Sequence, residues 1–295
     1  MTEMAKRIVV DFDNTMGVPG CDIDDGLALL FLLGNPELAQ VEAVCTAYGN
    51  SDIDTVGRAT ASLMDALASA GARIPVHRGA AGPDDPDSDA ARFLARVTAD
   101  NPGQIHIVAL GSLTNLRGAA AVDPAFFANA ASITLMGGIT ETLAFNGAIM
   151  NELNLSCDPA AARAVLEAPC PVRIATSQHC LPALFALEDF RKAFDEGSWV
   201  HRTCRYWFDD MARRYGTRGF VCWDVVAAAA LIRPDLFKPE QRRISLNDRF
   251  LGVGLLECAA EGVPCAVAET PAIAEPARFR AEVLAAWRRA AVAIS

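Results

Sequence analysis

The stretch RIVVDFDNTMGVPGCDIDDGLALLFLL, residues 7–33, joins a short apolar run to a longer one through an acidic loop. The first run is rich in Val and Ile, which is typical of a strand buried on both faces of a sheet. Asp24 and Asp25 precede the second run, and carboxylates are favoured at helix N-termini, so we predict a helix over residues 24–33. The stretch therefore predicts a strand, a loop and a helix, the repeating unit of α/β proteins.

The same alternation continues along the chain. Further apolar runs, VEAVCTAYG, QIHIVALG, SITLMGG and CPVRIATS, are predicted strands. We therefore expect one α/β domain over residues 1–295, with a central, mostly parallel β-sheet flanked by helices and a Rossmann-like core. The stretches between the runs predict helices over residues 24–33, 53–70, 113–122, 159–168, 200–214, 223–232 and 277–291.

Three segments rich in Gly, Pro and Asp interrupt this pattern, at residues 14–21, 79–89 and 137–157. Loops at the carboxyl ends of strands in such sheets usually build the ligand crevice. These segments are therefore candidate walls of a site, although a solvated surface loop is the favoured interpretation of the acidic segment 79–89.

The composition excludes several classes of protein. A net charge of −10 and the scarcity of lysine argue against a nucleic-acid partner. No run approaches the roughly 20 apolar residues of a membrane span, and no apolar signal segment precedes the first strand. Nine cysteines without a CxxC pair and four histidines without metal-ligand spacing give no disulfide framework or zinc site. We expect a soluble, cytoplasmic protein without a membrane partner.

Five aspartates fall within residues 11–25, and their number raises the question of what neutralises them. A single Asp before a helix is adequately explained as an N-cap. Several carboxylates in one crevice call for a cation, and a set of oxygen ligands favours Ca²⁺ or Mg²⁺. Asp224 begins another predicted helix, VVAAAALI, and is a candidate to close such a site.

The segment DFDNT, residues 11–15, also matches the nucleophile motif of haloacid-dehalogenase-type phosphatases. In that chemistry one Asp attacks phosphorus and the next acts as acid and base, with Mg²⁺ between them. It also needs a lysine beside the phosphoryl group and a downstream acidic pair. Neither Lys192 nor Lys238 has such a context, and no Gly-Asp dipeptide occurs, so the match is local.

Six segments in a fixed order carry a resemblance over most of the chain. They are DFD…DIDDGLAL, TAYGN, VALGSLTNL, ITLMGG, NELNLSCDPAAARAVL and WDVVAAAALIRPDLF. In this order they resemble the inosine–uridine-preferring nucleoside hydrolases, which cleave the N-glycosidic bond of ribonucleosides. The resemblance implies Ca²⁺-dependent hydrolysis of a small ribonucleoside to ribose and free base, by a homodimer or homotetramer.

The resemblance also assigns roles to individual residues. It makes Asp13 the carboxylate that both binds Ca²⁺ and activates water. The other metal ligands it implies are Asp25, Asp224 and the backbone carbonyl of Leu110. The positions that hold the ribose are Asp24, Asn50, Met136, Asn146, Glu152 and Asn154.

The spacing of the aspartates departs from the family pattern. In the family the first Asp of the DD pair follows the water-activating Asp by four positions, whereas Asp24 follows Asp13 by eleven. Seven residues within 14–22 are therefore extra. Asp22 is consequently an alternative to Asp13 as the base.

A second departure concerns the leaving base. Trp223 stands where the inosine–uridine group has a His, so that proton donor is missing. An indole can stack on a purine and make its ring more basic, which favours purine nucleosides. His179 or Arg213 is the alternative leaving-group device, and a non-catalytic nucleoside- or sugar-binding protein is the alternative function.

Overall fold

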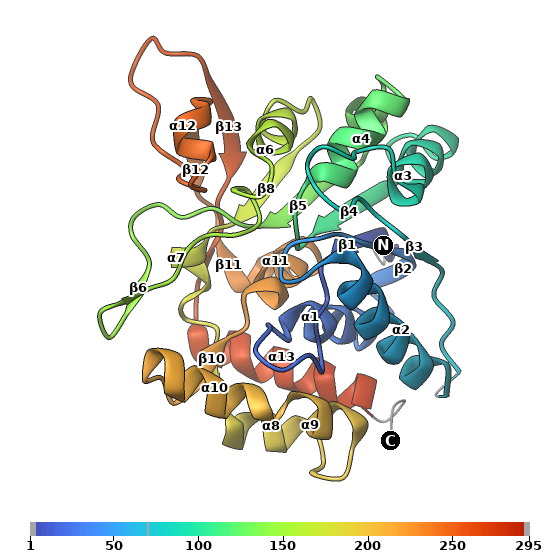
Figure 1. Cartoon of the computed structure of the whole chain (residues 1–295), viewed down its shortest axis with the longest axis vertical. Coiled ribbons are helices and arrows are strands. Elements are labelled where there is room, and N and C mark those ends of the chain that lie inside the picture. Colours follow the sequence, from blue (N-terminus) through green and yellow to red (C-terminus); the bar gives the residue numbers. More distant parts are fainter. Residues whose placement is uncertain (1–3, 70, 292–295) are drawn as a thin grey trace.

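A sheet with helices on both faces forms the body of the molecule in this computed structural model, which describes residues 4–69 and 71–291 (Figure 1). In chain order the strands are β1 (Lys6–Phe12), β2 (Ala39–Thr46), β3 (Val76–His77), β4 (Ile105–Ala109), β5 (Ser132–Met136), β6 (Ala144–Phe145), β7 (Ala148–Ile149), β8 (Val172–Ala175), β9 (Leu184–Ala186), β10 (Gly219–Val221), β11 (Phe237–Lys238), β12 (Gln241–Ser245), β13 (Cys265–Glu269) and β14 (Ala272–Ile273).

The helices fill the connections between these strands. They are α1 (Asp24–Leu33), α2 (Ile53–Ser69), α3 (Asp89–Asp100), α4 (Thr114–Val122), α5 (Phe126–Asn129), α6 (Pro159–Leu166), α7 (Ser177–Cys180), α8 (Leu187–Ala193), α9 (Trp199–Cys204), α10 (Tyr206–Tyr215), α11 (Trp223–Ile232), α12 (Asp248–Leu251) and α13 (Pro276–Ala291), with a 3₁₀ helix, η1 (Pro234–Leu236).

The main sheet has eight strands in the order β12-β13-β8-β5-β4-β1-β2-β3. All neighbouring strands are parallel except β12 and β13, which confirms the predicted α/β domain with a mostly parallel sheet. After β1 the chain adds β2 and β3 on one side, and then β4, β5 and β8 on the other. The strand order thus reverses at β1, and ligands of such sheets bind beyond the carboxyl ends of the strands at this reversal.

Two layers of helices cover the sheet (Figure 1). Helices α3, α4 and α6 pack together on one face, and α1, α11 and α13 cover the other, with α8 outside α13. Each layer encloses its own cluster of buried apolar side chains against the sheet. No helix in the described part of the chain has the length and apolar character that crossing a bilayer requires.

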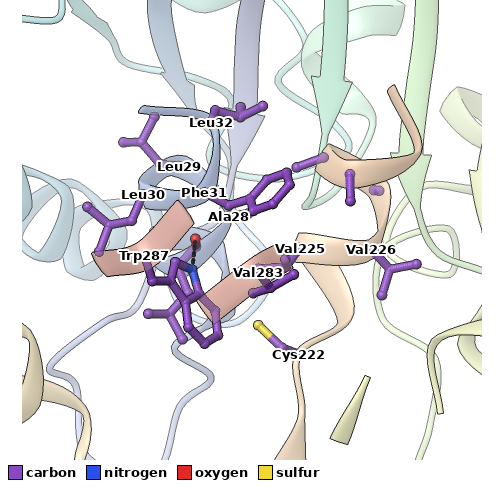
Figure 2. Packing of buried hydrophobic residues seen from close by; sticks show 14 of the residues in the cluster. Ala28, Leu29, Leu30, Phe31, Leu32, Cys222, Val225, Val226, Val283 and Trp287 are labelled. Atoms are coloured by element: carbon purple, nitrogen blue, oxygen red, sulfur yellow. Dashed lines mark hydrogen bonds between the residues drawn. The ribbon is translucent and has the colours of Figure 1, made fainter. Parts of the chain in front are cut away.

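Helices α1 and α11 are buried almost all round. Each has nine buried residues among its ten, as expected for a helix that is apolar on every face. They pack against each other, and Trp287 of α13 packs beside them and donates a hydrogen bond from Nε1 to the Leu27 carbonyl at 2.9 Å (Figure 2). This environment explains why both helices have the bounds predicted from their apolar runs.

Other elements differ from the prediction. The helix predicted over residues 200–214 is interrupted at Arg205, although the backbone of Arg205 is still helical (φ −56°, ψ −32°). Helix α3 was not predicted, although its buried residues recur at the spacing of an amphipathic helix. The pair β12 and β13 was also missed, since its strands are short and one of them is mostly polar. Residue 70, at the end of the helix predicted over 53–70, lies outside the described residues.

Candidate active site

A cavity with about 480 Å³ of empty space, partly open to solvent, lies where the carboxyl ends of the central strands meet. Leu110 follows β4 directly, Met136 ends β5, and Ser177 follows β8. The N-termini of α1 and α11 reach the same cavity. Its lining residues are Asp22, Asp24, Asn50, Leu110, Met136, Leu143, Met150, Asn151, Glu152, Leu153, Asn154, Ser177, Trp223 and Asp224.

Three carboxylates from the two buried helices meet at this cavity. Oxygen atoms of Asp24, Asp25 and Asp224 all lie within 4.8 Å of one another. The backbone N–H of Asp224 donates to Asp24 Oδ2 at 3.1 Å, which joins the two helix N-termini directly. The structure thus brings together carboxylates separated by 200 residues, as the sequence predicted.

Asp13 lies beside this group but is not among the residues that line the cavity. Its side chain is fully buried, and Asn50 donates to it twice, from the backbone N to Oδ2 at 2.6 Å and from Nδ2 to Oδ1 at 3.2 Å. The backbone N–H of Asp13 donates to Asp25 Oδ1 at 3.2 Å. Asp13 therefore touches the carboxylate group through Asp25 and is positioned by Asn50.

The electrostatics of the four carboxylates favour a bound cation. Burial, together with the charge of neighbouring carboxylates, raises the pKa of Asp25 and Asp224 well above 3.8 and that of Asp24 to about 8. In residues 4–69 and 71–291, none of the four forms an ion pair with a basic side chain. A donor set of buried, unneutralised carboxylates fits a hard divalent metal ion.

Leu110 lines the same cavity. Asn154 Nδ2 donates to the Leu110 carbonyl at 2.8 Å and to the Met136 carbonyl at 3.0 Å. The side chain of Asn154 therefore ties together the ends of β4 and β5, where the predicted carbonyl ligand lies.

Glu152 has a structural task in addition to lining the cavity. Its carboxylate accepts hydrogen bonds from the backbone N–H groups of Gly138 at 3.1 Å, Leu155 at 2.8 Å and Ser156 at 2.9 Å. These bonds hold the segment 137–157 as a wall of the cavity. That segment was one of the three predicted walls, whereas no residue of the other two, 14–21 and 79–89, lines this cavity.

Trp223 lies between this cavity and a smaller, mostly apolar one of about 220 Å³. Phe145 of the β6–β7 hairpin packs edge to face against two rings. Its ring centroid lies 6.3 Å from that of Trp223 and 5.9 Å from that of Tyr215. All three rings line the smaller cavity. The first residue of α11 thus connects the acidic end of the site to an aromatic end.

Three residues singled out from the sequence lie away from the main cavity. Asn146 is exposed on the β6–β7 hairpin, with Nδ2 donating to the Tyr215 carbonyl at 2.6 Å. His179 Nε2 lies 3.6 Å from Glu240, and Arg213 pairs with Asp210 at 2.8 Å. In this structure none of the three faces the cavity, so their proposed roles remain predictions.

Several cavity residues were missed by sequence reasoning. Leu143, Met150, Asn151 and Leu153 lie on the long wall segment, whose individual side chains carry no periodic signal. Ser177 could have been found, because it is the last residue of the predicted strand CPVRIATS and carboxyl ends of parallel strands face the crevice.

Asp11 does not belong to the cavity wall. It is fully buried in β1, and its Oδ1 accepts a hydrogen bond from Asn115 Nδ2 at 2.7 Å. Burial raises its pKa to about 8. A carboxyl group enclosed in this way cannot attack a substrate, which argues against the phosphatase hypothesis.

The Asn115 side chain links β1 and β2 to the segment 80–88. Nδ2 also donates to the Thr46 carbonyl at 2.9 Å, and Oδ1 accepts from the Ala80 N–H at 2.9 Å and from Ser88 Oγ at 3.0 Å. One buried amide therefore makes four hydrogen bonds and is the hydrogen-bond partner of the Asp11 carboxyl group.

We expect Asn115→Ala to lower the free energy of unfolding by about 3 kcal/mol, because several buried polar groups lose their partner at once. Urea unfolding would measure the change. Asn129→Ala is the matched control, since the Asn129 side chain has no hydrogen bond to any described residue, and it should change stability by less than about 0.5 kcal/mol. Equal effects of the two substitutions would contradict this role for Asn115.

Comparisons with known proteins agree with the geometry. The family model for inosine-uridine preferring nucleoside hydrolases matches residues 8–250. The chain is 25% identical over 279 residues to uridine nucleosidase 1 of Arabidopsis thaliana, covering 84% of this chain and 80% of that protein. It is 26% identical over 280 residues to a pyrimidine-specific ribonucleoside hydrolase of Enterobacter sp. (strain 638), covering 85% and 84%.

Solved structures show the same fold. A purine-preferring ribonucleoside hydrolase from Gardnerella vaginalis superposes with a TM-score of 0.82 at 18% identity, covering 97% of this chain and 100% of that one. A plant nucleoside hydrolase also gives a TM-score of 0.82, at 19% identity, covering 96% and 99%.

The fold places acidic helix N-termini where the strand order of the sheet reverses. The family model matches residues 8–250, and together these findings define a nucleoside-cleaving hydrolase. The chain belongs to the inosine-uridine preferring nucleoside hydrolase family.

Proposed function

We propose that this enzyme hydrolyses the N-glycosidic bond of ribonucleosides in a Ca²⁺-dependent reaction and prefers purine nucleosides. The observation that carries the proposal is the meeting of Asp24, Asp25 and Asp224 within 4.8 Å, beside a cavity that Trp223 also lines. The acidic groups suit a metal and a sugar, and the aromatic ring suits a base.

The metal would be held by Asp13, Asp25, Asp224 and the Leu110 carbonyl. When bound, Ca²⁺ supplies positive charge that neutralises these carboxylates and makes a nearby water more acidic. Asp13 then takes the proton of the attacking water as general base. Its two hydrogen bonds from Asn50 fix the orientation of the carboxylate for this task.

The ribose would lie against the polar wall of the cavity. Asp24, Asn50, Glu152 and Asn154 offer acceptors and donors for sugar hydroxyl groups, and the Met136 side chain packs beside the ring. Positive charge develops on the ribosyl group as the glycosidic bond breaks, and nearby carboxylates stabilise it. Asn146 would join this set only if its hairpin moved.

Trp223 supports the purine preference. Its ring borders both cavities, and the smaller cavity is lined mainly by apolar side chains that would surround a base. The matched relatives include both pyrimidine- and purine-directed enzymes by name, so the preference rests on Trp223.

A substrate panel tests this function and separates it from its alternatives. Purified protein would be incubated with inosine, guanosine, uridine, cytidine and a phosphomonoester while reducing sugar, phosphate and binding heat are measured. We expect release of ribose, fastest from the purine nucleosides. Binding heat without ribose release would indicate a non-catalytic binding protein, and phosphate release would indicate a phosphatase.

We expect Trp223→Ala to reduce the kcat/KM for inosine by roughly 10- to 100-fold and to affect uridine far less, since a purine presents more surface for stacking. Steady-state kinetics on both substrates would measure this. Trp199→Ala is the control, because Trp199 lines neither cavity and should leave the ratio of the two substrates unchanged. An equal loss on both substrates would contradict the stacking role.

A further inference from the structure

We propose that Asp22, carried by the extra residues within 14–22, is a substrate-binding carboxylate that accepts a hydrogen bond from a hydroxyl or N–H group of the nucleoside. The inference rests on the proposed function and assigns a role to a segment that the family pattern lacks. It also separates Asp22 from Asp13, which the spacing of the aspartates alone could not do.

The loop that carries Asp22 is held in place by side chains on both sides. Thr15 Oγ1 donates to the Asp22 carbonyl at 2.7 Å from within the loop. From α10, Tyr206 Oη donates to the Val18 carbonyl at 2.7 Å and Arg214 Nη2 donates to the Gly20 carbonyl at 2.6 Å. These bonds fix the backbone and leave the Asp22 carboxylate free for another partner.

The Asp22 carboxylate lines the main cavity, and no described residue donates a hydrogen bond to it. Three other carboxylates of the site differ in this respect, whereas Asp224, a proposed metal ligand, also has no hydrogen-bond donor among the described residues. Asp13 accepts from Asn50, Asp24 accepts from the Asp224 N–H, and Glu152 accepts from three backbone groups. Asp22 therefore has free hydrogen-bonding capacity in the cavity wall.

Within residues 4–69 and 71–291, no basic side chain forms an ion pair with the Asp22 carboxylate. Arg214 is the basic group that acts on Asp22, but its Nε pairs with Asp210 at 2.8 Å and its Nη2 is bonded to Gly20. Arg213 also pairs with Asp210. Asp22 is thus half-buried in the wall of the cavity where the substrate would lie. Burial raises the pKa of its carboxyl group to about 6, so the group is mostly ionised at neutral pH.

The chemistry of an ionised carboxylate defines what it can recognise. It accepts hydrogen bonds and donates none, so its partner must be a donor. A nucleoside offers donors on its ribose hydroxyls and on its base, and both would be accepted strongly because the acceptor is charged. Selection of a donor at this point is the role that the seven extra residues would serve.

The test compares Asp22→Asn with wild-type protein at saturating Ca²⁺. We expect the dissociation constant and KM of inosine to rise about 10- to 100-fold, with kcat changed less than about threefold. Calcium affinity, measured by calorimetry, should fall much less than in Asp224→Asn, because the charge of Asp22 acts on the metal carboxylates without Asp22 being a proposed ligand. Asp84→Asn removes the same charge from an exposed loop outside the cavity and should change none of these values.

Analogues then identify the donor. Inosine lacking its 2′, 3′ or 5′ hydroxyl, and purine riboside, which lacks the N1–H group, would be bound to both proteins. The analogue without the relevant donor should bind wild-type and Asp22→Asn proteins equally, as in a double-mutant cycle. Asp22→Ser should reproduce the pattern, so that misfolding of a single variant does not decide the result.

Three results would overturn the proposal. They are unchanged inosine affinity, a loss of kcat with affinity intact, which would make Asp22 the base, and a loss of calcium affinity as large as in Asp224→Asn, which would make it a metal ligand. The proposed function is tested separately, because it is wrong if wild-type protein releases no ribose. Even then, the dissociation constants of the two proteins for inosine would still test the role of Asp22.

Discussion

Exhaustive chelation should reduce ribose release at least about 1000-fold and lower the melting temperature by roughly 10 °C in the same sample. A cation bound only by the folded state stabilises it by about 4 kcal/mol at a concentration 1000 times its dissociation constant. Without it, Asp24, Asp25 and Asp224 repel one another within 4.8 Å in a buried site. Kinetics, elemental analysis and thermal unfolding of the metal-free protein would measure these changes.

Restoring the metal provides the control for this experiment. Added Ca²⁺ should recover both activity and melting temperature, and Mg²⁺ should recover less because it requires a smaller and more regular arrangement of ligands. The variant Asp224→Asn should bind Ca²⁺ more weakly than Asp84→Asn, whose carboxylate is exposed and remote. Full activity in protein shown to be free of metal would contradict the assignment of this site.

Replacing Asp13 by Asn should reduce kcat by about 100- to 10,000-fold, the usual contribution of a general base. The amide keeps the shape of the side chain but takes no proton from water. Inosine binding should remain within about threefold of the wild-type value, since Asp13 does not line the cavity surface. Single-turnover kinetics at saturating Ca²⁺, with metal content measured in parallel, would separate loss of the base from loss of the ion.

Asp22→Asn is the matched comparison for this substitution. The two variants remove the same charge from positions nine residues apart, one held by Asn50 and one facing the cavity. We expect Asp13→Asn to lower kcat and Asp22→Asn to weaken inosine binding. The reverse pattern would show that the extra residues have moved the base from Asp13 to Asp22.

The sequence predicted best those parts of the fold whose signal is local. Helices α1 and α11 have the predicted bounds because their apolar runs are continuous and an Asp stands at each start. The five predicted parallel strands were found for a similar reason, as each is a short apolar run. In contrast, β9 and β10 form a small sheet of their own across a sequence gap, which no local pattern reveals.

The candidate site was predicted in its chemistry but not in its contacts. The resemblance placed Asp13, Asn50 and Asp25 in one site, and the structure shows the Asn50 amide in contact with both carboxylates. Which carboxylates face the cavity could not be predicted, because this depends on how the extra loop lies against α10. Asn146 shows the limit of transfer by position, since its hairpin points it toward Tyr215.

Because α1 and α11 are almost entirely buried, heating should not unfold them before the rest of the domain. Local opening usually begins in segments with few buried contacts. Here three of the acidic side chains stand at the ends of two helices whose bodies are interior almost throughout, so they cannot separate while the rest of the domain stays folded. The acidic site should therefore keep its shape until the whole domain melts, with or without the ion, and amide protons in these two helices should exchange with solvent only through complete unfolding.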